Sequence, residues 1–438
     1  MENSKQRSCG AVLLLLLLLL LLLLLLLLLL LDAIAGIGLM AGAASSTARR
    51  GSLRSGVKPS AWVDSSAAKA SILRASILQH RRRARNFERR VGNLMVVHMH
   101  VGTGFGDADS PTRAVLRLTL DSADGVLTAS EPIPMTAGEN PGWLCAQNSI
   151  ATFVGFEDNP GLLQAYRIGA DGALEPIGAS VSSVGRHPCF LALDMSGEWL
   201  FAANYTEGSV CVCPILPDGS LGRATDSKKH QGGELIDTAL HDRQEAAHCH
   251  AIVPHPSNEW VATCDLGLST VFIYGFDAAR GTLSGAADDP RHLRCDANAG
   301  CRHACWDGAG GLLFVNNELD CTVTVARFDA ATGTLTAAQT VAALPEGVAP
   351  LRDHHRGGSD IALHPNGRFL YAGMRSPDPG LIAIFAVDDQ STLTLLGHAS
   401  TRGLVPRNVR CQRDPGVLTV TVTVTVTVTV TVTATLTL

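Results

Sequence analysis

The chain has 438 residues and a net charge of −5, with 46% hydrophobic and 17% charged residues. The charge is unevenly divided, because residues 1–91 contain 14 basic and 4 acidic side chains and the remainder therefore has a net charge of −15. Such an acidic body excludes binding to nucleic acid through its bulk surface. Any anionic ligand must be held by positive charge that is concentrated in one pocket.

Residues 1–45 are predicted to be a signal peptide or an uncleaved signal-anchor. Residues 13–31 are 19 consecutive leucines, enough for a helix of roughly 28 Å at ~1.5 Å per residue, which is about the thickness of a bilayer core. Lys5 and Arg7 precede this run, and the small residues at 41–43 resemble a cleavage site. The segment predicts entry into the secretory pathway, and a retained helix would give membrane association.

Residues 46–91 form a basic segment rich in serine, alanine and arginine. From residue 33 to residue 87 there are ten Lys or Arg residues and one acidic residue, Asp64. This composition resembles a transit peptide, and a signal followed by a transit-like stretch suits import into a plastid. The alternatives are a basic linker behind a membrane anchor and a low-complexity leader with no targeting role.

Four phrases after residue 92 follow one template, a short apolar strand that comes after a Gly, Asn or Ser turn and ends at a polar position. They begin at Trp199, Trp260, Leu312 and Phe369, with spacings of 61, 52 and 57 residues. Self-similarity at such a period indicates an array of units that bury their faces against one another. Equivalent positions in different units can therefore be compared in space.

A second mark, Gly-x-Leu, recurs every 47 to 62 residues and is expected to form hairpin turns. Several strands per unit, repeated six or seven times, predict an all-β chain with a seven-bladed β-propeller at residues 92–416. A strand at residues 93–101 is expected to help close the ring. The marks begin at Gly125, Gly172, Gly219, Gly281 and Gly333, with Ser391 at the corresponding place of the sixth unit.

Residues 417–438 form a low-complexity tail in which threonine and valine alternate. As one strand, residues 419–433 would run for ~50 Å, against ~17–20 Å for a typical strand. We expect only a fraction of the tail to join the last blade, which is therefore predicted to be incomplete. No function is assigned to the tail.

The 12 cysteines include no Cys-x-x-Cys pair, whereas a zinc site built from cysteine and histidine would need two well-spaced pairs. The cysteines are expected to be buried reduced thiols. No metal and no other cofactor is predicted.

Two positions of the repeat carry side chains that diverge into charged and polar types. Ten residues before the strand landmarks stand Cys189, His250, Arg302 and Ser359, and Arg407 joins this set by its Pro-Arg context. The position after the last polar residue of each strand holds Tyr205, Leu266, Glu318 and Arg375.

Equivalent positions of successive propeller blades lie on a circle around the axis. Arginines, a histidine and a carboxylate from four blades are therefore expected to converge on one cavity. The alternative is that these residues cap strand ends and pair with one another, as Arg302 and Glu318 could. For the whole set, in an acidic protein, we favour a ligand site.

The phrases around these positions resemble the propeller-type 6-phosphogluconolactonase family, which also includes fungal carboxy-cis,cis-muconate cyclases. The resemblance covers roughly residues 93–410, and the order and spacing of the phrases make it specific. It implies a seven-bladed propeller. The phrases are Ala203-Asn204-Tyr205, His248-Cys249-His250, Asp265-Leu266-Gly267, Cys301-Arg302-His303, Asn317-Glu318-Leu319, Arg368-Phe369-Leu370 and Pro406-Arg407.

The sequence departs from the family pattern in three places. Cys301 stands where the family usually has proline, Met374 stands where asparagine is common, and the Thr-Val tail overwrites much of the last blade. The catalytic groups proposed for the family fall here on His248 or His250, Arg302, Glu318 and Arg375.

The resemblance implies hydrolysis of 6-phospho-D-glucono-1,5-lactone to 6-phosphogluconate, in the pentose phosphate pathway. His250 is favoured as the base that deprotonates water, with Glu318 orienting it or acting as base itself. Arg302 is the candidate for stabilising the oxyanion, and Arg375 offers a donor for phosphate. The substrate-binding set is completed by His303, Arg407, Tyr205 and Asn317.

Two other functions remain open. A muconate-type lactonising enzyme would use the same basic pocket on a polycarboxylate, because arginine binds carboxylate and phosphate alike. A non-catalytic propeller scaffold is the second alternative, although Trp306-Asp307 is the only Trp-Asp pair and does not recur as it does in WD-repeat proteins.

Overall fold

The chain divides into two units, Met1–Arg85 and Asn86–Leu438, and all described residues belong to the second. The predicted signal segment and the transit-like linker, residues 1–45 and 46–91, lie outside the described residues. No helix that could span a bilayer occurs in the part of the chain that is described. The computed structural model describes residues 96–102, 114–121, 127–129, 132–133, 135, 137–147, 151–233, 243–286, 289, 291–350, 357–377, 379–401, 403, 405–411, 418–422 and 430–434.

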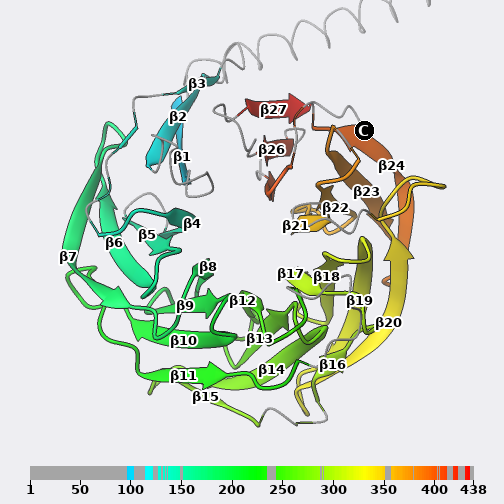
Figure 1. Cartoon of the computed structure of the whole chain (residues 1–438), viewed down its shortest axis with the longest axis horizontal. Helices are drawn as coiled ribbons and strands as arrows, with labels where there is room; N and C mark the ends of the chain where they lie inside the picture. Colours follow the sequence, from blue (N-terminus) through cyan, green and yellow to red (C-terminus); the bar gives the residue numbers. More distant parts are fainter. Residues whose placement is uncertain are drawn as a thin grey trace, which may run out of the picture. The chain divides into compact units, whose positions relative to one another are not determined.

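The second unit is built from seven antiparallel sheets, numbered here as blades 1 to 7 in chain order (Figure 1). Strands that follow one another in the chain pair side by side, as β-branched alternation separated by hairpin turns favours. The described residues contain strands and no helix. The predicted all-β seven-bladed propeller is therefore confirmed.

The blades have these strands. Blade 1 contains β1 (Val96–Gly102), β2 (Val115–Asp121) and β3 (Leu127–Ala129). Blade 2 contains β4 (Pro141–Gln147), β5 (Ala151–Phe156), β6 (Leu162–Ile168) and β7 (Leu174–Ser182). Blade 3 contains β8 (Pro188–Leu193), β9 (Trp199–Asn204), β10 (Ser209–Pro214) and β11 (Asp226–Lys229). Blade 4 contains β12 (Cys249–Pro254), β13 (Trp260–Asp265), β14 (Thr270–Asp277), β15 (Thr282–Ser284) and β16 (Leu293–Arg294).

The last three blades complete the ring of sheets. Blade 5 contains β17 (Cys301–Trp306), β18 (Leu312–Asn317), β19 (Thr322–Asp329) and β20 (Thr334–Ala342). Blade 6 contains β21 (Gly358–Leu363), β22 (Phe369–Met374), β23 (Leu381–Val387) and β24 (Leu393–Ser400). Blade 7 contains β25 (Asn408–Cys411), β26 (Leu418–Val422) and β27 (Val430–Ala434).

The first strand of each blade lies toward the centre of the ring and the last strand toward its rim (Figure 1). Successive first strands contact one another, from β4 to β8, β12, β17, β21 and β25. Side chains at the same position of these strands can therefore face a common axis.

The Gly-x-Leu marks and the corresponding Ser391 turn form the predicted turns before β7, β15, β20 and β24. Gly172, Gly281 and Gly333 have φ angles of 78°, 64° and 71°, a left-handed conformation in which glycine avoids the clash of a Cβ atom. Ser391 adopts φ 69° at the corresponding turn of blade 6, where the carboxylate of Asp388 accepts two backbone N–H bonds. Asn and Asp side chains stabilise such turns by bonding to the backbone that follows them.

The two periodic marks of the sequence contact each other across neighbouring blades. A Cβ atom added to Gly281 would lie 2.0 Å from the ring of Trp199, and one added to Gly333 would lie 2.2 Å from the ring of Trp260. Each tryptophan thus packs on the turn of the next blade. The second residues of the same strands, Leu200 and Val261, are fully buried between the sheets.

Blade 7 takes two strands from the threonine–valine segment. β26 and β27 pair with each other and β26 pairs with β25. The predicted tail therefore supplies part of the last sheet, and the boundary predicted at residue 416 falls inside that sheet. At the other end, the strand predicted at residues 93–101 is β1, which pairs with β2 in blade 1.

Candidate active site

The first strands of blades 2 to 6 each carry a β-bulge at the same place. The pairing register shifts at Gly142, Cys189, His250 and Arg302, and across Ser359 and Asp360 in blade 6. An extra residue at a bulge leaves the ladder and re-aims its side chain. Four of these bulge residues were identified from the sequence, ten residues before the start of each repeated phrase. They are Cys189, His250, Arg302 and Ser359.

The position directly after the second strand is held by the same backbone hydrogen bond in several blades. In blades 2 to 6, the residue directly after the second strand donates its backbone N–H to the carbonyl two residues before the bulge of the same blade. Tyr205 donates to His187 and Glu318 to Gly300, and the same bond recurs in the other blades. The full set of donors is Glu157, Tyr205, Leu266, Glu318 and Arg375, with N–O distances of 2.7, 2.9, 2.9, 2.8 and 2.8 Å.

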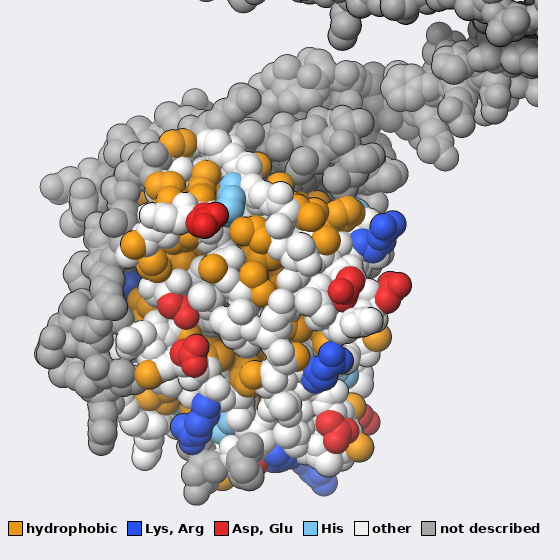
Figure 2. All heavy atoms as spheres, turned by 90° about the vertical axis from the view of Figure 1, so that its right-hand side faces the viewer, with side chains coloured by type: hydrophobic (Ala, Val, Ile, Leu, Met, Phe, Trp, Pro, Cys, Tyr) orange, Lys and Arg blue, Asp and Glu red, His pale blue; other side chains and the backbone are white. Residues whose placement is uncertain are grey.

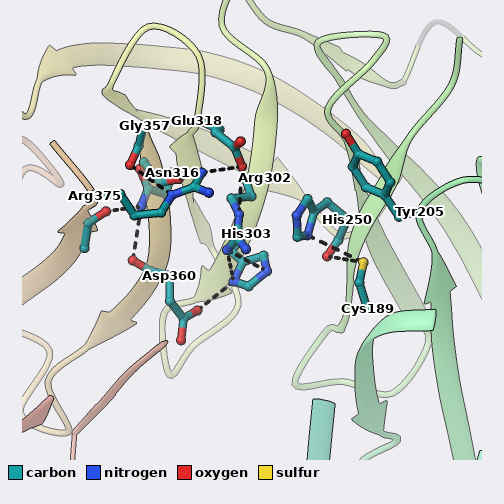
Figure 3. Close-up of polar contacts among 12 residues, drawn as sticks. Cys189, Tyr205, His250, Arg302, His303, Asn316, Glu318, Gly357, Asp360 and Arg375 are labelled. Carbon is teal, nitrogen blue, oxygen red and sulfur yellow. Dashed lines mark hydrogen bonds and ion pairs between the residues drawn. The ribbon is translucent and has the colours of Figure 1, made fainter. Parts of the chain in front are cut away.

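Glu318 is the centre of an arginine cluster (Figure 3). Its Oε2 atom lies 2.8 Å from Nε of Arg302 and 2.7 Å from Nη2 of Arg375. Nη2 of Arg243 donates to Oε1 of Glu318 at 2.5 Å. The side chains of Arg302, Arg375 and Glu318 are each 2% exposed. These groups therefore form one buried network in which a single carboxylate faces three guanidinium groups.

The charges of this cluster set the ionisation of its members. Burial would raise the pKa of Glu318, but Arg243, Arg375 and Arg302 hold this pKa well below its usual value. Burial, together with the neighbouring charge of Arg375, lowers the pKa of Arg302 to about 9 although Glu318 opposes the change. At neutral pH the carboxylate is ionised and the guanidinium remains charged. The excess positive charge favours an anionic ligand.

His303 connects Arg302 to blades 6 and 7. Nδ1 of His303 lies 2.8 Å from Oδ1 of Asp360, and Nη1 of Arg302 lies 3.0 Å from Nε2 of the imidazole. These contacts are consistent when Nδ1 carries the proton and Nε2 accepts from the guanidinium. Oδ2 of Asp360 accepts from Nδ2 of Asn408 at 2.9 Å and from the backbone N–H of Val409 at 3.0 Å. Asp360 therefore fixes both His303 and the start of β25, directly after Arg407.

The two histidines of the His-x-His phrase have different surroundings. His250 is 5% exposed, and its Nδ1 lies 3.6 Å from Sγ of Cys189. Burial and the positive charge of Arg302 lower the pKa of His250 well below its usual value, so the imidazole is neutral. His248 stacks on the ring of Tyr205 with a centroid distance of 4.4 Å, and its Nε2 lies 3.0 Å from Oε1 of Glu245.

Cys189 lies among these groups but is not set up as a nucleophile. Burial and the carboxylate of Glu157 raise the pKa of its thiol far above the ordinary value. A thiol becomes a nucleophile as the thiolate, which this environment disfavours.

Arg407 and Glu157 complete the described part of the site. Both are half-buried, and their charges interact with each other and with Arg302. Burial and the nearby charge of Arg375 lower the pKa of Arg407. The site thus contains four arginines, Arg243, Arg302, Arg375 and Arg407, and two glutamates, Glu157 and Glu318.

Most of the residues predicted from sequence meet here, and one does not. Nδ2 of Asn317 donates to the hydroxyl oxygens of Thr322 and Thr324 at 2.8 and 2.9 Å. Its amide group therefore holds β18 to β19. Sequence reasoning placed it with the substrate-binding residues only because it stands next to Glu318.

Three residues of the site were missed. Asp360 lies beside Ser359 in the bulge of blade 6, which spans two residues. The repeat spacing identifies only one residue per blade, so it found Ser359 and not Asp360. Glu157 has the register position of Glu318, but its strand ends at the apolar Phe156 and lacks the template used to find the others. Arg243 lies in a connection outside the repeat, and no sequence signal marks it.

One group of potential metal ligands occurs among the described residues. Ligand atoms of His230, Cys249 and Asp265 lie within 4.8 Å of one another, and all three residues are buried. Nδ1 of His230 lies 2.7 Å from Oδ2 of Asp265, and the backbone N–H groups of His248 and Leu268 donate to Oδ1 at 2.9 and 3.0 Å. Asp265 is thus already engaged in holding the end of β13.

The outer surface contrasts with the axis. The face in Figure 2, on the side of β20 and β24, presents basic and acidic side chains interspersed with one another. Interspersed surface charges give no strong field of one sign on that face. The arginines of the site are instead gathered where solvent screens them little.

Comparison with known proteins identifies the family. A sequence model described as "Lactonase, 7-bladed beta-propeller" matches residues 100–433. A protein of Pectobacterium carotovorum named 6-phosphogluconolactonase is 31% identical over 293 residues, which are 67% of this chain and 80% of that protein. A protein of Bacillus subtilis with the same name is 28% identical over 283 residues, covering 64% of this chain and 76% of the relative.

A solved structure is similar over most of the propeller. The periplasmic gluconolactonase of Pseudomonas aeruginosa superposes with a TM-score of 0.65 at 26% identity, covering 75% of this chain and 89% of that chain. The seven antiparallel sheets agree with the seven blades of the matched family model. This chain is therefore a lactone hydrolase that belongs to the family of seven-bladed β-propeller lactonases.

Proposed function

We propose that the substrate is 6-phospho-D-glucono-1,5-lactone and that the product is 6-phosphogluconate, as in the pentose phosphate pathway. The observation that carries the proposal is the convergence of Arg243, Arg302, Arg375 and Arg407 on two carboxylates in an otherwise acidic protein. A phosphorylated lactone needs positive charge twice, at its phosphate and at the oxygen that becomes negative during hydrolysis.

Arg302 is assigned to the carbonyl oxygen. Its Nε faces Glu318 and its Nη1 faces His303, so the guanidinium is held in one orientation before substrate binds. A preorganised donor stabilises developing negative charge without reorganising at the moment of reaction, and loss of one such donor costs about 10²–10³ in rate. Glu318 is a weak base in this setting, because three arginines favour its ionised form.

Arg407 is assigned to the phosphate. It is half-buried and stands directly before β25, whereas Arg243 and Arg375 face Glu318 directly. Charged donors with a forked geometry suit phosphate oxygens. His250, His248 and Tyr205 then lie along the sugar side of the site, where a neutral imidazole can both donate and accept a hydrogen bond.

The test is hydrolysis by the full-length protein, with 6-phosphogluconolactone and unphosphorylated gluconolactone compared after subtraction of the spontaneous rate. We expect a marked preference for the phosphorylated lactone. In Arg302→Ala the rate of hydrolysis should fall by about 10²–10³-fold. Equal rates on both lactones would mean that the enzyme does not recognise the phosphate and that its substrate is a plain sugar lactone. Activity on a muconolactone alone would favour the polycarboxylate alternative.

A further inference from the structure

The arginine cluster does not itself supply the group that moves protons during hydrolysis. Water attacking the lactone must lose a proton, and the ring oxygen that leaves must gain one. Glu318 is held ionised by three arginines, and the pKa of His250 lies well below its usual value. Both groups are therefore weak proton acceptors at neutral pH.

Glu157 directly follows β5, the second strand of blade 2. Its backbone N–H donates to the carbonyl oxygen of Asn140 at 2.7 Å, the bond by which Glu318 is anchored to Gly300 in blade 5. The two glutamates therefore have equivalent backbone positions in blades 2 and 5.

The bulge of blade 2 makes room for this carboxylate. The bulge residue is Gly142, where blades 3, 4 and 5 have Cys189, His250 and Arg302. A Cβ atom at Gly142 would lie 2.0 Å from Oε1 of Glu157 and 2.4 Å from its Cδ. The carboxylate therefore lies against the bare backbone of the bulge, in the slot that a larger bulge side chain would fill.

Glu157 interacts electrostatically with its neighbour Asp158 and with three groups from other parts of the chain. Arg407 before β25 and Arg302 on β17 are its cationic neighbours, Asp158 is the adjacent carboxylate, and Cys189 on β8 is a thiol. Burial raises the pKa of Glu157 to about 7 against the lowering effect of Arg407 and Arg302. Glu157 is half-buried as a residue.

We propose that Glu157 is the catalytic residue that takes the proton from the attacking water and returns it to the leaving oxygen of the ring. This inference rests on the lactone hydrolysis proposed above. The water oxygen bonds to the carbonyl carbon while its proton passes to the Glu157 carboxylate, and the carbonyl electron pair moves to the oxygen near Arg302. The pair then returns, the bond from carbon to ring oxygen breaks, and the carboxylic acid protonates the ring oxygen. The carboxylate is regenerated, and one water is consumed per lactone opened.

The test is the pH profile of kcat/KM for the full-length protein and for Glu157→Gln. We expect the wild-type value to rise with one-proton dependence as pH increases through about 7. In Glu157→Gln we expect kcat/KM to fall by about 10²–10³-fold, because general base catalysis contributes ~10²–10⁴-fold. The rise of kcat/KM with pH, the pH limb, should also disappear. Glu175→Gln, on the exposed face of β7 in the same blade, should match the wild type.

Gly142→Ala provides a second variant that keeps the glutamate but displaces its carboxylate. We expect it to lower kcat/KM as well. Thermal melting gives a readout that does not depend on turnover: a group whose pKa is raised by folding loses its stabilising effect as pH rises from 4.5 through 7. Glu157→Gln should therefore melt higher than the wild type at pH 8, and by a smaller margin at pH 5.

The two proposals fail in different ways. An active wild type whose rate and pH limb survive in a folded Glu157→Gln would overturn the role of Glu157 alone. A melting difference that does not change with pH would also overturn it. A folded wild type that opens neither lactone would remove the proposed function, and the role of Glu157 with it.

Discussion

Nη2 of Arg375 lies 2.7 Å from Oε2 of Glu318, and the two residues occupy the same position of neighbouring blades. Glu318 directly follows β18 in blade 5, and Arg375 directly follows β22 in blade 6. The same carboxylate also holds Arg302 of β17 and Arg243, which precedes β12 of blade 4. One buried side chain therefore joins three blades at the axis.

Removal of this charge should destabilise the protein. Glu318→Gln leaves the buried Arg302 and Arg375 and the half-buried Arg243 without their common counter-charge, and breaking a buried ion pair costs about 3–5 kcal/mol. We expect a lower urea midpoint and loss of lactonase activity. The matched control is Glu207→Gln, whose partners Arg186 and Lys229 are exposed, and whose loss should cost below about 1 kcal/mol. Equal midpoints for the two variants would contradict the prediction.

Glu318 should also give the protein a dependence on acid pH. Its pKa is lowered by folding, so its contribution to stability is present above the unfolded value of 4.5 and is lost as pH falls toward the folded value. The urea midpoint of the wild type should therefore decline as pH decreases below about 4.5. The decline should be shallower in Glu318→Gln. Parallel curves would show that another group is responsible.

Arg407 is expected to set specificity and not rate. In Arg407→Ala, KM for the phosphorylated lactone should rise by about 10–100-fold, because a hydrogen bond to a charged group contributes ~1.5–3 kcal/mol. KM for unphosphorylated gluconolactone should change little. Arg294→Ala, an exposed arginine on β16, serves as the control for loss of a positive charge. A matched rise in both KM values would place Arg407 at the lactone instead of the phosphate.

The contact between Trp260 and Gly333 predicts a large effect at a turn. Gly333→Ala introduces a Cβ atom 2.2 Å from the tryptophan ring at φ 71°, so strain and overpacking add to roughly 2–4 kcal/mol. Gly367 has φ 72° with no atom within 4 Å of an added Cβ, and Gly367→Ala isolates the backbone cost. Calorimetry should find the lower melting temperature for Gly333→Ala. A reversed order would mean that the tryptophan moves aside without cost.

The repeat made much of this architecture predictable. Trp199 and Trp260 each pack on a glycine turn of the next blade. This contact links the two periodic marks of the sequence, the repeated strand phrase and the Gly-x-Leu turn. The same regularity placed His250 and Arg302 at the axis, because their bulges share one register.

Residues that break the repeat were harder to predict. Arg243 reaches Glu318 from a connection whose length no repeat fixes, and Asp360 depends on a bulge that is one residue longer than the others. Asn317 has the right neighbour in sequence but extends toward β19. Side-chain direction at a strand end depends on local pairing, which the spacing of residues does not encode.

The bulges also have an evolutionary consequence. Each lifts one residue out of the hydrogen-bond ladder, so the backbone that presents it is the same for glycine, cysteine, histidine or arginine. A mutation at such a position changes the chemistry at the axis while the hydrogen-bond ladder of the blade is kept. New substrates can therefore be acquired one blade at a time, by single substitutions that selection tests separately on an unchanged scaffold.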